Sequence, residues 1–114
     1  MKAKQFLIAT GGRPRQHPNI PADIAITSDD LFSLKEDPGK TLVVGGGYIA
    51  VECAGFLAGV GKDVTLINRS TFLRAMDSDM AEKIVEDLEE EGVKALTQTT
   101  IGYAKKLENG KIEV

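Results

Sequence analysis

The sequence predicts an α/β domain: a parallel sheet with flanking helices, followed by a C-terminal antiparallel hairpin. Three observations lead to this fold class. Short apolar runs alternate with segments of helical periodicity, a run of three glycines joins one strand to one helix, and an Asn-Gly pair separates two short runs near the C-terminus. Strands that alternate with helices form parallel sheets with right-handed crossovers.

The N-terminal part is expected to hold one strand, a linker and a brief helix. Residues 5–10 (QFLIAT) are an apolar run that ends at two glycines, which predicts a buried strand. Residues 13–24 contain three of the four prolines and should be extended. Residues 27–30 offer several N-caps for a helix at 29–34, and residues 38–40 (PGK) predict a turn.

The regular alternation begins at residue 41. Residues 41–44 (TLVV) form a β-branched run of the kind found in buried parallel strands. Gly61 and Gly92 follow two helical segments, as expected for C-terminal caps. We expect strands at residues 41–44, 63–68 and 93–97, and helices at residues 48–60 and 77–91.

The second of these helices is expected to be amphipathic, with glutamates opposite its apolar face. After the third strand, Asn109-Gly110 lies between Leu107 and Ile112, and Asn-Gly in such a place is the strongest short-range signal for a hairpin. The apolar face of the helix consists of Met80, Ala81, Ile84, Val85 and Leu88.

Composition narrows the class of partner. The chain has 114 residues, enough for one domain with its own core, and 42% of them are hydrophobic, which argues against disorder. A net charge of −3 and the lack of a Lys/Arg run give no support for a nucleic-acid partner. No apolar stretch approaches the ~18 residues that span a membrane. One cysteine, Cys53, excludes an internal disulfide or a CxxC metal or redox pair.

Residues 45–50 (GGGYIA) form a G-x-G-x-x-A motif between a predicted strand and a predicted helix. Gly45 can make the tight turn, Gly47 lacks the Cβ that would collide with a pyrophosphate, and Ala50 lets the helix pack closely on the sheet. The helix N-terminus then directs free N–H groups and a partial positive charge at the phosphates. The motif predicts a Rossmann-like dinucleotide-binding unit. The alternative is a tight turn that binds no ligand.

The end of the second strand indicates which dinucleotide. An NAD-binding unit usually has Asp or Glu there to hold the ribose 2′-hydroxyl, but this chain continues with Asn68, Arg69 and Ser70 and has Arg74 shortly after. Two guanidinium groups can hold a 2′-phosphate through charge-assisted hydrogen bonds. We therefore expect NADPH, with solvated surface arginines as the alternative.

The sequence resembles the flavin-dependent pyridine nucleotide-disulfide oxidoreductases, the glutathione reductase superfamily. Residues 45–59 (GGGYIAVECAGFLAG) resemble the pyridine-nucleotide segment of these enzymes. The likeness is greatest to the high-molecular-weight thioredoxin reductases and covers nearly the whole chain. The segments that carry it are residues 28–34, 38–45, 52–59, 69–74 and 77–81.

The resemblance implies a role for individual residues. Tyr48 matches a tyrosine that covers the flavin until the nicotinamide displaces it, and Glu52 matches a glutamate near the nicotinamide and the flavin edge. The alternatives are a surface aromatic and a solvated helix charge. No metal site is expected. The expected cofactor-binding residues are Gly45, Gly47, Tyr48, Ile49, Ala50, Glu52, Arg69, Ser70 and Arg74.

The resemblance also implies two parts. Residues 1–39 correspond to the last strand and linker of the FAD domain, and residues 40–114 to an NADPH-binding unit truncated before its last parallel strand. We consider that residues 5–10 fill that vacant place in the sheet. The family's FAD fingerprint, redox-active cysteine pair and interface domain are missing, so the chain alone should not catalyse. Cys53 is expected to be a small core residue, and His17 a solvated loop residue.

The expected function is therefore that of an NADPH-binding fragment of an enzyme that passes a hydride from NADPH through FAD to a disulfide such as thioredoxin or glutathione. FAD and the FAD and interface domains belong to the complete enzyme, expected to be a cytoplasmic or mitochondrial homodimer. Three alternatives stay open: a free-standing NAD(P)-binding module, a fragment of an NAD-dependent dihydrolipoamide dehydrogenase type, and a structural domain with an empty glycine loop.

Overall fold

The structure is a computed structural model and describes residues 2–114. It has a three-stranded parallel sheet in the order β1-β2-β3 and a small antiparallel pair, β4 with β5. The α/β fold class and the C-terminal hairpin are confirmed. The elements are α1 (Ser28–Leu31), β1 (Thr41–Val44), α2 (Tyr48–Gly59), β2 (Val64–Ile67), α3 (Ser78–Glu90), β3 (Lys94–Leu96), β4 (Lys105–Lys106) and β5 (Ile112–Glu113).

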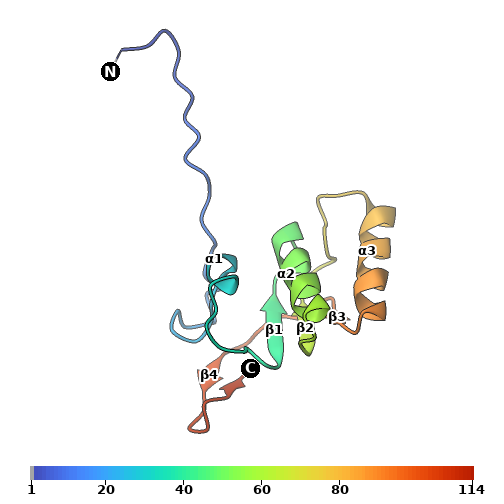
Figure 1. The fold of residues 1–114 in the computed structure, drawn as a ribbon. Coiled ribbons are helices and arrows are strands. Elements are labelled where there is room, and N and C mark those ends of the chain that lie inside the picture. The colour runs from blue at the N-terminus through green and yellow to red at the C-terminus, as the bar shows by residue number, and fades with distance from the viewer. Residues whose placement is uncertain (1) are drawn as a thin grey trace.

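The sheet has its helices on one face (Figure 1). In the register of the strands, Val43 of β1 lies beside Leu66 of β2, which lies beside Ala95 of β3. Both crossovers lead in the same direction along the sheet, and right-handed crossovers of that kind put both helices on the same side. The helices also meet, because a Cβ added to Gly55 of α2 would lie 3.1 Å from Leu88 Cδ2 of α3.

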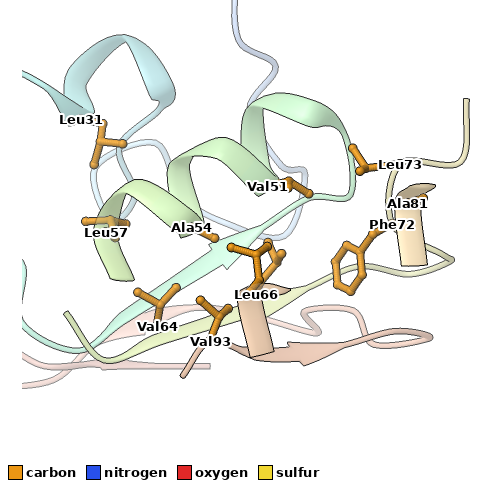
Figure 2. Packing of buried hydrophobic residues seen from close by; sticks show 11 residues of the cluster. Leu31, Val51, Ala54, Leu57, Val64, Leu66, Phe72, Leu73, Ala81 and Val93 are labelled. Atoms are coloured by element: carbon orange, nitrogen blue, oxygen red, sulfur yellow. The ribbon is translucent and has the colours of Figure 1, made fainter. Parts of the chain in front are cut away.

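The core lies between α2 and the middle strand. Figure 2 shows Val51, Ala54 and Leu57 pointing from α2 toward Val64 and Leu66 of β2. Ala54 and Leu66 are fully buried, with an exposed fraction of 0%. Burying a valine or leucine side chain contributes about 1.5–3 kcal/mol, so this contact holds the glycine turn before α2 against the end of β2. The same cluster includes Leu31, Phe72, Leu73, Ala81, Leu88 and Val93.

Residues 5–10 do not form the predicted strand. They are extended, belong to neither sheet, and lead away from the body of the domain at the N-terminal end of the ribbon (Figure 1). Phe6, Leu7 and Ile8 have exposed fractions of 73%, 91% and 85%. The proposal that this segment fills a vacant place in the sheet is therefore wrong. The linker is fixed to the body farther along, where Asn19 Nδ2 donates to the Ile101 carbonyl oxygen at 2.8 Å.

The apolar face of α3 is only partly buried. Ala81 and Leu88 lie in the core, whereas Met80 and Ile84 have exposed fractions of 61% and 42%. The helix packs at the β3 edge of a sheet of three strands, which is too narrow to cover the whole apolar face. Its start agrees with the sequence, because Asp77 Oδ1 accepts a hydrogen bond from the Met80 N–H at 3.1 Å.

No helix in the part of the chain that the structure describes is long and apolar enough to cross a membrane.

Candidate functional site

A pocket of about 300 Å³ lies between the glycine turn at the start of α2 and the loop that follows β2. It brings together five of the nine residues singled out in the sequence: Gly47, Tyr48, Arg69, Ser70 and Arg74. Gly45, Ile49, Ala50 and Glu52 are outside its lining. The remaining lining residues are Gly46, Asn68, Thr71, Leu73, Ala75 and Met76.

Gly45 turns the chain from β1 into the site. Its φ of +149° is a value that residues with a side chain rarely adopt, and its N–H donates to the Ile67 carbonyl oxygen at 2.9 Å, which extends the β1–β2 pairing. A Cβ on Gly45 would lie 3.2 Å from the Ala50 Cβ. Gly45 and Ala50 therefore shape the turn from behind the pocket rather than line it, as their roles in the motif require.

The start of α2 is open to a ligand. Gly47 is its N-cap, without a side chain to bond the first N–H groups, and no atom lies within 4 Å of the place where a Cβ on Gly47 would be. The first intrahelical bond runs from the Val51 N–H to the Gly47 carbonyl oxygen at 3.2 Å. The N–H groups of the first turn have no partner inside the helix, and no acidic side chain occupies that turn. This end of α2 can therefore accept an anion.

The loop after β2 carries the arginines and is anchored at several points. Asn68 continues the sheet, with its N–H donating to the Leu96 carbonyl oxygen at 3.0 Å. Phe72 and Leu73 are buried in the core, with exposed fractions of 5% and 4%. Leu73 has a φ of +52°, and its N–H donates to the Gly46 carbonyl oxygen at 2.7 Å. These contacts hold the loop beside the glycine turn.

The pocket is electropositive. Among its lining residues, Arg69 and Arg74 are the charged ones, and both are exposed. The ion pairs within residues 2–114 join Lys40 to Asp63 and Lys62 to Asp37, so neither arginine takes part in one. Two guanidinium groups without carboxylate partners, together with the Ser70 hydroxyl and the α2 N-terminus, are suited to bind a ligand with several phosphates.

Tyr48, Ile49 and Glu52 lie on the exposed side of α2, where Tyr48 and Ile49 have exposed fractions of 56% and 47%. Next to them, Cys53 is half-buried against the core, as expected for a small packing residue. Burial first, and the negative charge of Glu52 second, raise the pKa of the Cys53 thiol above its usual value. The cysteine is therefore a poor nucleophile at neutral pH.

His17 lies outside the pocket. It is half-buried rather than fully solvated, and its Nδ1 accepts a hydrogen bond from the Asn19 N–H at 3.2 Å. In the described part of the chain, no three His, Cys, Asp or Glu side chains gather closely enough to hold a metal ion.

Asn68 contributes more to the site than the lack of charge that the sequence indicates. Its Nδ2 donates to the Thr71 carbonyl oxygen at 2.8 Å, to the Ser70 carbonyl oxygen at 3.2 Å and to Ser70 Oγ at 3.4 Å. Asparagine is common where a side chain replaces backbone partners in a turn, so its place at a strand end was the available signal.

The family model for the pyridine nucleotide-disulphide oxidoreductases matches residues 1–114. The chain belongs to this family. Its similarity to the flavoprotein disulfide reductase RclA from Escherichia coli, in the Cu(II) complex, is 33% identity over 85% of this chain and 21% of that one, with a TM-score of 0.72. This pyridine nucleotide-disulphide oxidoreductase domain is thus an NAD(P)-binding domain of the flavoprotein disulfide reductase and oxidase type.

Two related oxidases also resemble the domain. The water-forming NADH oxidase from Lactobacillus brevis, bound to NADH, is 26% identical over 71% of this chain and 18% of that one, with a TM-score of 0.58. An engineered water-forming NADPH oxidase, a mutant of that enzyme bound to NADPH, is 35% identical over 59% of this chain and 15% of that one, with a TM-score of 0.56. The chain thus spans between 15% and 21% of the length of these proteins. One of these oxidases is bound to NADH and the other to NADPH. Similarity to them therefore does not determine which of the two cofactors this chain prefers, and the preference has to be inferred from the chain's own residues.

Proposed function

We propose that this chain is the NADPH-binding domain of a flavoprotein disulfide reductase, an enzyme that passes a hydride from NADPH through FAD to a disulfide such as thioredoxin or glutathione. The observation that carries the proposal is the juxtaposition of Arg69, Ser70 and Arg74 with the glycine turn around one pocket that has no acidic lining residue. The whole activity belongs to the complete enzyme.

The residues divide the binding of NADPH between two ends of the pocket. The open first turn of α2 at Gly47 binds the pyrophosphate through backbone N–H groups. Arg69, Ser70 and Arg74 bind the 2′-phosphate of the adenosine ribose. We assign Tyr48 and Glu52, which are exposed on α2, to the nicotinamide and flavin side, with Ile49 beside them. When bound, NADPH supplies the hydride and FAD accepts it.

The engineered NADPH oxidase supports the choice of NADPH. It differs from its parent NADH oxidase by five substitutions: glycine to alanine, aspartate to alanine, alanine to arginine and methionine to serine at the next two positions, and a proline farther on to arginine. The spacing from the first of these to the second is the spacing from Ala50 to Asn68. Arg69 and Ser70 then follow directly, and Arg74 comes one position earlier than the last arginine of the mutant. This chain therefore has the mutant's arginine and serine at the two places after Asn68, a neutral residue at the place of the aspartate, and a second arginine one position from that of the mutant.

The rest of the parent enzyme is also part of the proposal. We assign residues 1–39 to the end of an FAD domain and residues 40–114 to the NADPH-binding unit, with the high-molecular-weight thioredoxin reductases as the nearest type. The exposed apolar segment around Leu7 supports this division, because an exposed apolar run of this kind marks a surface that another part of a protein covers. The partners are the FAD and interface domains of a homodimer. A cytoplasmic enzyme, or a mitochondrial one, fits the use of NADPH to keep disulfides reduced.

The test is calorimetric titration with NADPH, NADH and 2′-phospho-AMP. Each charge-assisted hydrogen bond contributes about 1.5–3 kcal/mol, so we expect NADPH to bind at least about tenfold more tightly than NADH. The Arg69→Ala/Arg74→Ala variant should remove that difference. The matched control is Arg13→Ala/Arg15→Ala, which loses the same charge from the N-terminal linker, outside the pocket lining.

The alternatives predict different outcomes in the same titration. Equal binding of NADPH and NADH favours a free-standing NAD(P) module, and preference for NADH favours the NAD-dependent dihydrolipoamide dehydrogenase type. No binding of any of the three ligands favours a structural domain. Any of these three results, or an unchanged preference in the pocket variant, contradicts the NADPH proposal.

A further inference from the structure

The arginines of the pocket lie on an irregular loop, so their positions depend on the contacts that hold this loop to the rest of the domain. Arg69 and Arg74 are both exposed, and neither forms an ion pair within residues 2–114. A loop that must be ordered when the ligand binds loses part of its binding free energy to that ordering, whereas a loop already fixed does not. The contacts that fix residues 69–74 therefore influence the preference for a 2′-phosphate.

The side chain of Asn68 supplies one set of these contacts. Its Nδ2 reaches the carbonyl oxygens of Thr71 at 2.8 Å and Ser70 at 3.2 Å, and Ser70 Oγ at 3.4 Å. The backbone of Asn68 is fixed at the end of the sheet by two hydrogen bonds of 3.0 Å. Its N–H donates to the Leu96 carbonyl oxygen, and its carbonyl oxygen accepts from the Thr99 N–H. The amide thus connects a rigid strand end to the loop that carries the arginines.

Gly46 makes room for this amide. A Cβ added to Gly46 would overlap the Nδ2 and Cγ atoms of Asn68 and would lie 2.9 Å from its Oδ1. Gly46 does not need to be glycine for its backbone, since its φ lies outside the left-handed region. It occupies the variable position of G-x-G-x-x-A, where the phosphate loop itself demands no glycine. The glycine here is explained by the side chain of Asn68.

We propose that Asn68 is a positioning residue for cofactor preference: its amide, packed on the bare backbone of Gly46, fixes the loop of Arg69, Ser70 and Arg74 in the geometry that binds a 2′-phosphate. We call this the Asn68–Gly46 contact. The inference rests on the proposed NADPH-binding function. The Leu73 N–H, which donates to the Gly46 carbonyl oxygen at 2.7 Å, holds the far end of the loop to the same glycine.

The chemistry of the amide matters, because all three partners of Nδ2 accept hydrogen bonds. Only a donor satisfies the carbonyl oxygens of Ser70 and Thr71. Alanine at position 68 leaves them to water, and the loop loses its support while the arginines themselves stay. The consequence is specific to the 2′-phosphate, since the pyrophosphate is bound by the backbone at Gly47.

The test is a cycle of four proteins: wild type, Gly46→Ala, Asn68→Ala and the double variant. The measured quantity is the ratio of the NADH to the NADPH dissociation constant, with the melting temperature as a check of folding. We expect each single variant to lower this ratio by about fivefold to tenfold, because part of the free energy of 2′-phosphate binding is then lost to ordering the loop. In the Asn68→Ala background, Gly46→Ala should change the ratio by less than about twofold, because the clash is gone.

A control separates positioning from general stability. Asn109→Ala removes an asparagine that bonds the Lys111 N–H in the hairpin, at 3.0 Å and away from the pocket, and should leave the ratio unchanged. A merely structural role for Asn68 would weaken NADPH and NADH equally and leave the ratio constant, which would overturn the proposal. Additive effects of the two substitutions would overturn it as well. If Asn68→Ala does not fold, Asn68→Ser replaces it, since one hydroxyl can restore at most one of the three bonds.

The outcomes distinguish this inference from the proposed function. A wild-type protein without preference for NADPH contradicts the function, and the contact then remains testable by melting temperature alone: Gly46→Ala should destabilise the wild type and not the Asn68→Ala variant. A wild-type preference that survives in Asn68→Ala contradicts the positioning role and leaves the function standing.

Discussion

Replacing Asn68 by aspartate is the most informative single change, because it alters chemistry at nearly constant shape. The donor Nδ2 becomes an oxygen, so the hydrogen bonds to the carbonyl oxygens of Thr71 and Ser70, at 2.8 and 3.2 Å, are replaced by repulsion between oxygens. Two lost bonds cost about 2 kcal/mol of loop fixation. The variant also places a negative charge in the lining of a pocket where we propose that a 2′-phosphate binds.

The size of the pocket gives a scale for the distance between that charge and the phosphate. A sphere with the pocket's volume of about 300 Å³ is roughly 8 Å across, and at that separation two unit charges repel by about 0.5 kcal/mol in water and about 2 kcal/mol at an effective dielectric constant of 20. Together with the lost bonds, we expect NADPH to bind about 30-fold or more weakly. NADH has no 2′-phosphate, and a carboxylate at a strand end can bond its ribose hydroxyl, so its affinity should hold or rise.

The assay is calorimetric titration of both nucleotides at about 25 mM and about 300 mM salt, because screening reduces only the electrostatic part of the loss. The NADPH penalty of Asn68→Asp should therefore shrink at the higher salt concentration without vanishing. A ratio of NADH to NADPH dissociation constants that changes by less than about threefold would refute both the position assigned to the 2′-phosphate and the role of the amide.

Three further predictions concern the core, the cysteine and an ion pair. Leu66→Ala removes a fully buried side chain at the centre of the sheet and should lower the free energy of unfolding by about 3 kcal/mol in urea titrations; a loss below about 1 kcal/mol would place the core elsewhere. Because burial and the charge of Glu52 raise the pKa of Cys53, alkylation by iodoacetamide at neutral pH should be slow and should quicken in Glu52→Gln, whereas equal rates would exclude the charge of Glu52 as a cause. The Lys62 ammonium, at 2.6 Å, lowers the pKa of the Asp37 carboxyl below its ordinary value of 3.8. Its contribution to stability is therefore present above that value and lost as the pH falls through the lowered pKa. Asp37→Asn should be less stable than the wild type at about pH 6, and the difference should shrink as the pH falls below the ordinary value; a constant difference would contradict the ion pair.

The sequence predicts the sheet and helices well, because glycines mark where they end. β1 (Thr41–Val44) has the bounds expected, and α2 ends one residue before the prediction, just ahead of Gly61 with a φ of +80°. Gly92 and Gly110 likewise have φ values of +93° and +79° at the ends of α3 and in the hairpin. Positive φ is a local requirement that a single residue type reveals, so it needs no knowledge of the rest of the chain.

The wrong predictions share a different cause. The apolar run at residues 5–10 and the face of α3 at Met80 and Ile84 both indicate residues suited to burial, but the pattern does not say which surface covers them. A three-stranded sheet offers α3 cover for Ala81 and Leu88 only, and residues 5–10 find no strand to pair with in this chain.

The Asn68–Gly46 contact was beyond prediction because it joins two motifs that the sequence shows separately. The G-x-G-x-x-A pattern treats Gly46 as a free position, and the strand end draws attention to charge at Asn68. Only the register of β1 with β2, which sets Val44 beside Ile67, brings the residues that follow each strand face to face. The position of Leu73 at a φ of +52° is likewise imposed by its bond to Gly46 and its burial rather than by its residue type.

Under the proposed function, one set of groups in the pocket determines how tightly a dinucleotide binds, and another determines whether NADPH or NADH is preferred. The pyrophosphate contacts come from backbone groups at the start of α2 and persist through most side-chain substitutions, whereas the choice between NADPH and NADH depends on the side chains of a short loop. The L. brevis oxidase and its mutant, bound to NADH and NADPH, differ by five substitutions. In this chain the loop is also bound to the glycine turn through Gly46. A change of preference from NADPH to NADH would therefore have to alter the arginines together with Gly46 and Asn68. A larger residue at position 46 or an acid at position 68 would disturb the loop that the Asn68–Gly46 contact holds.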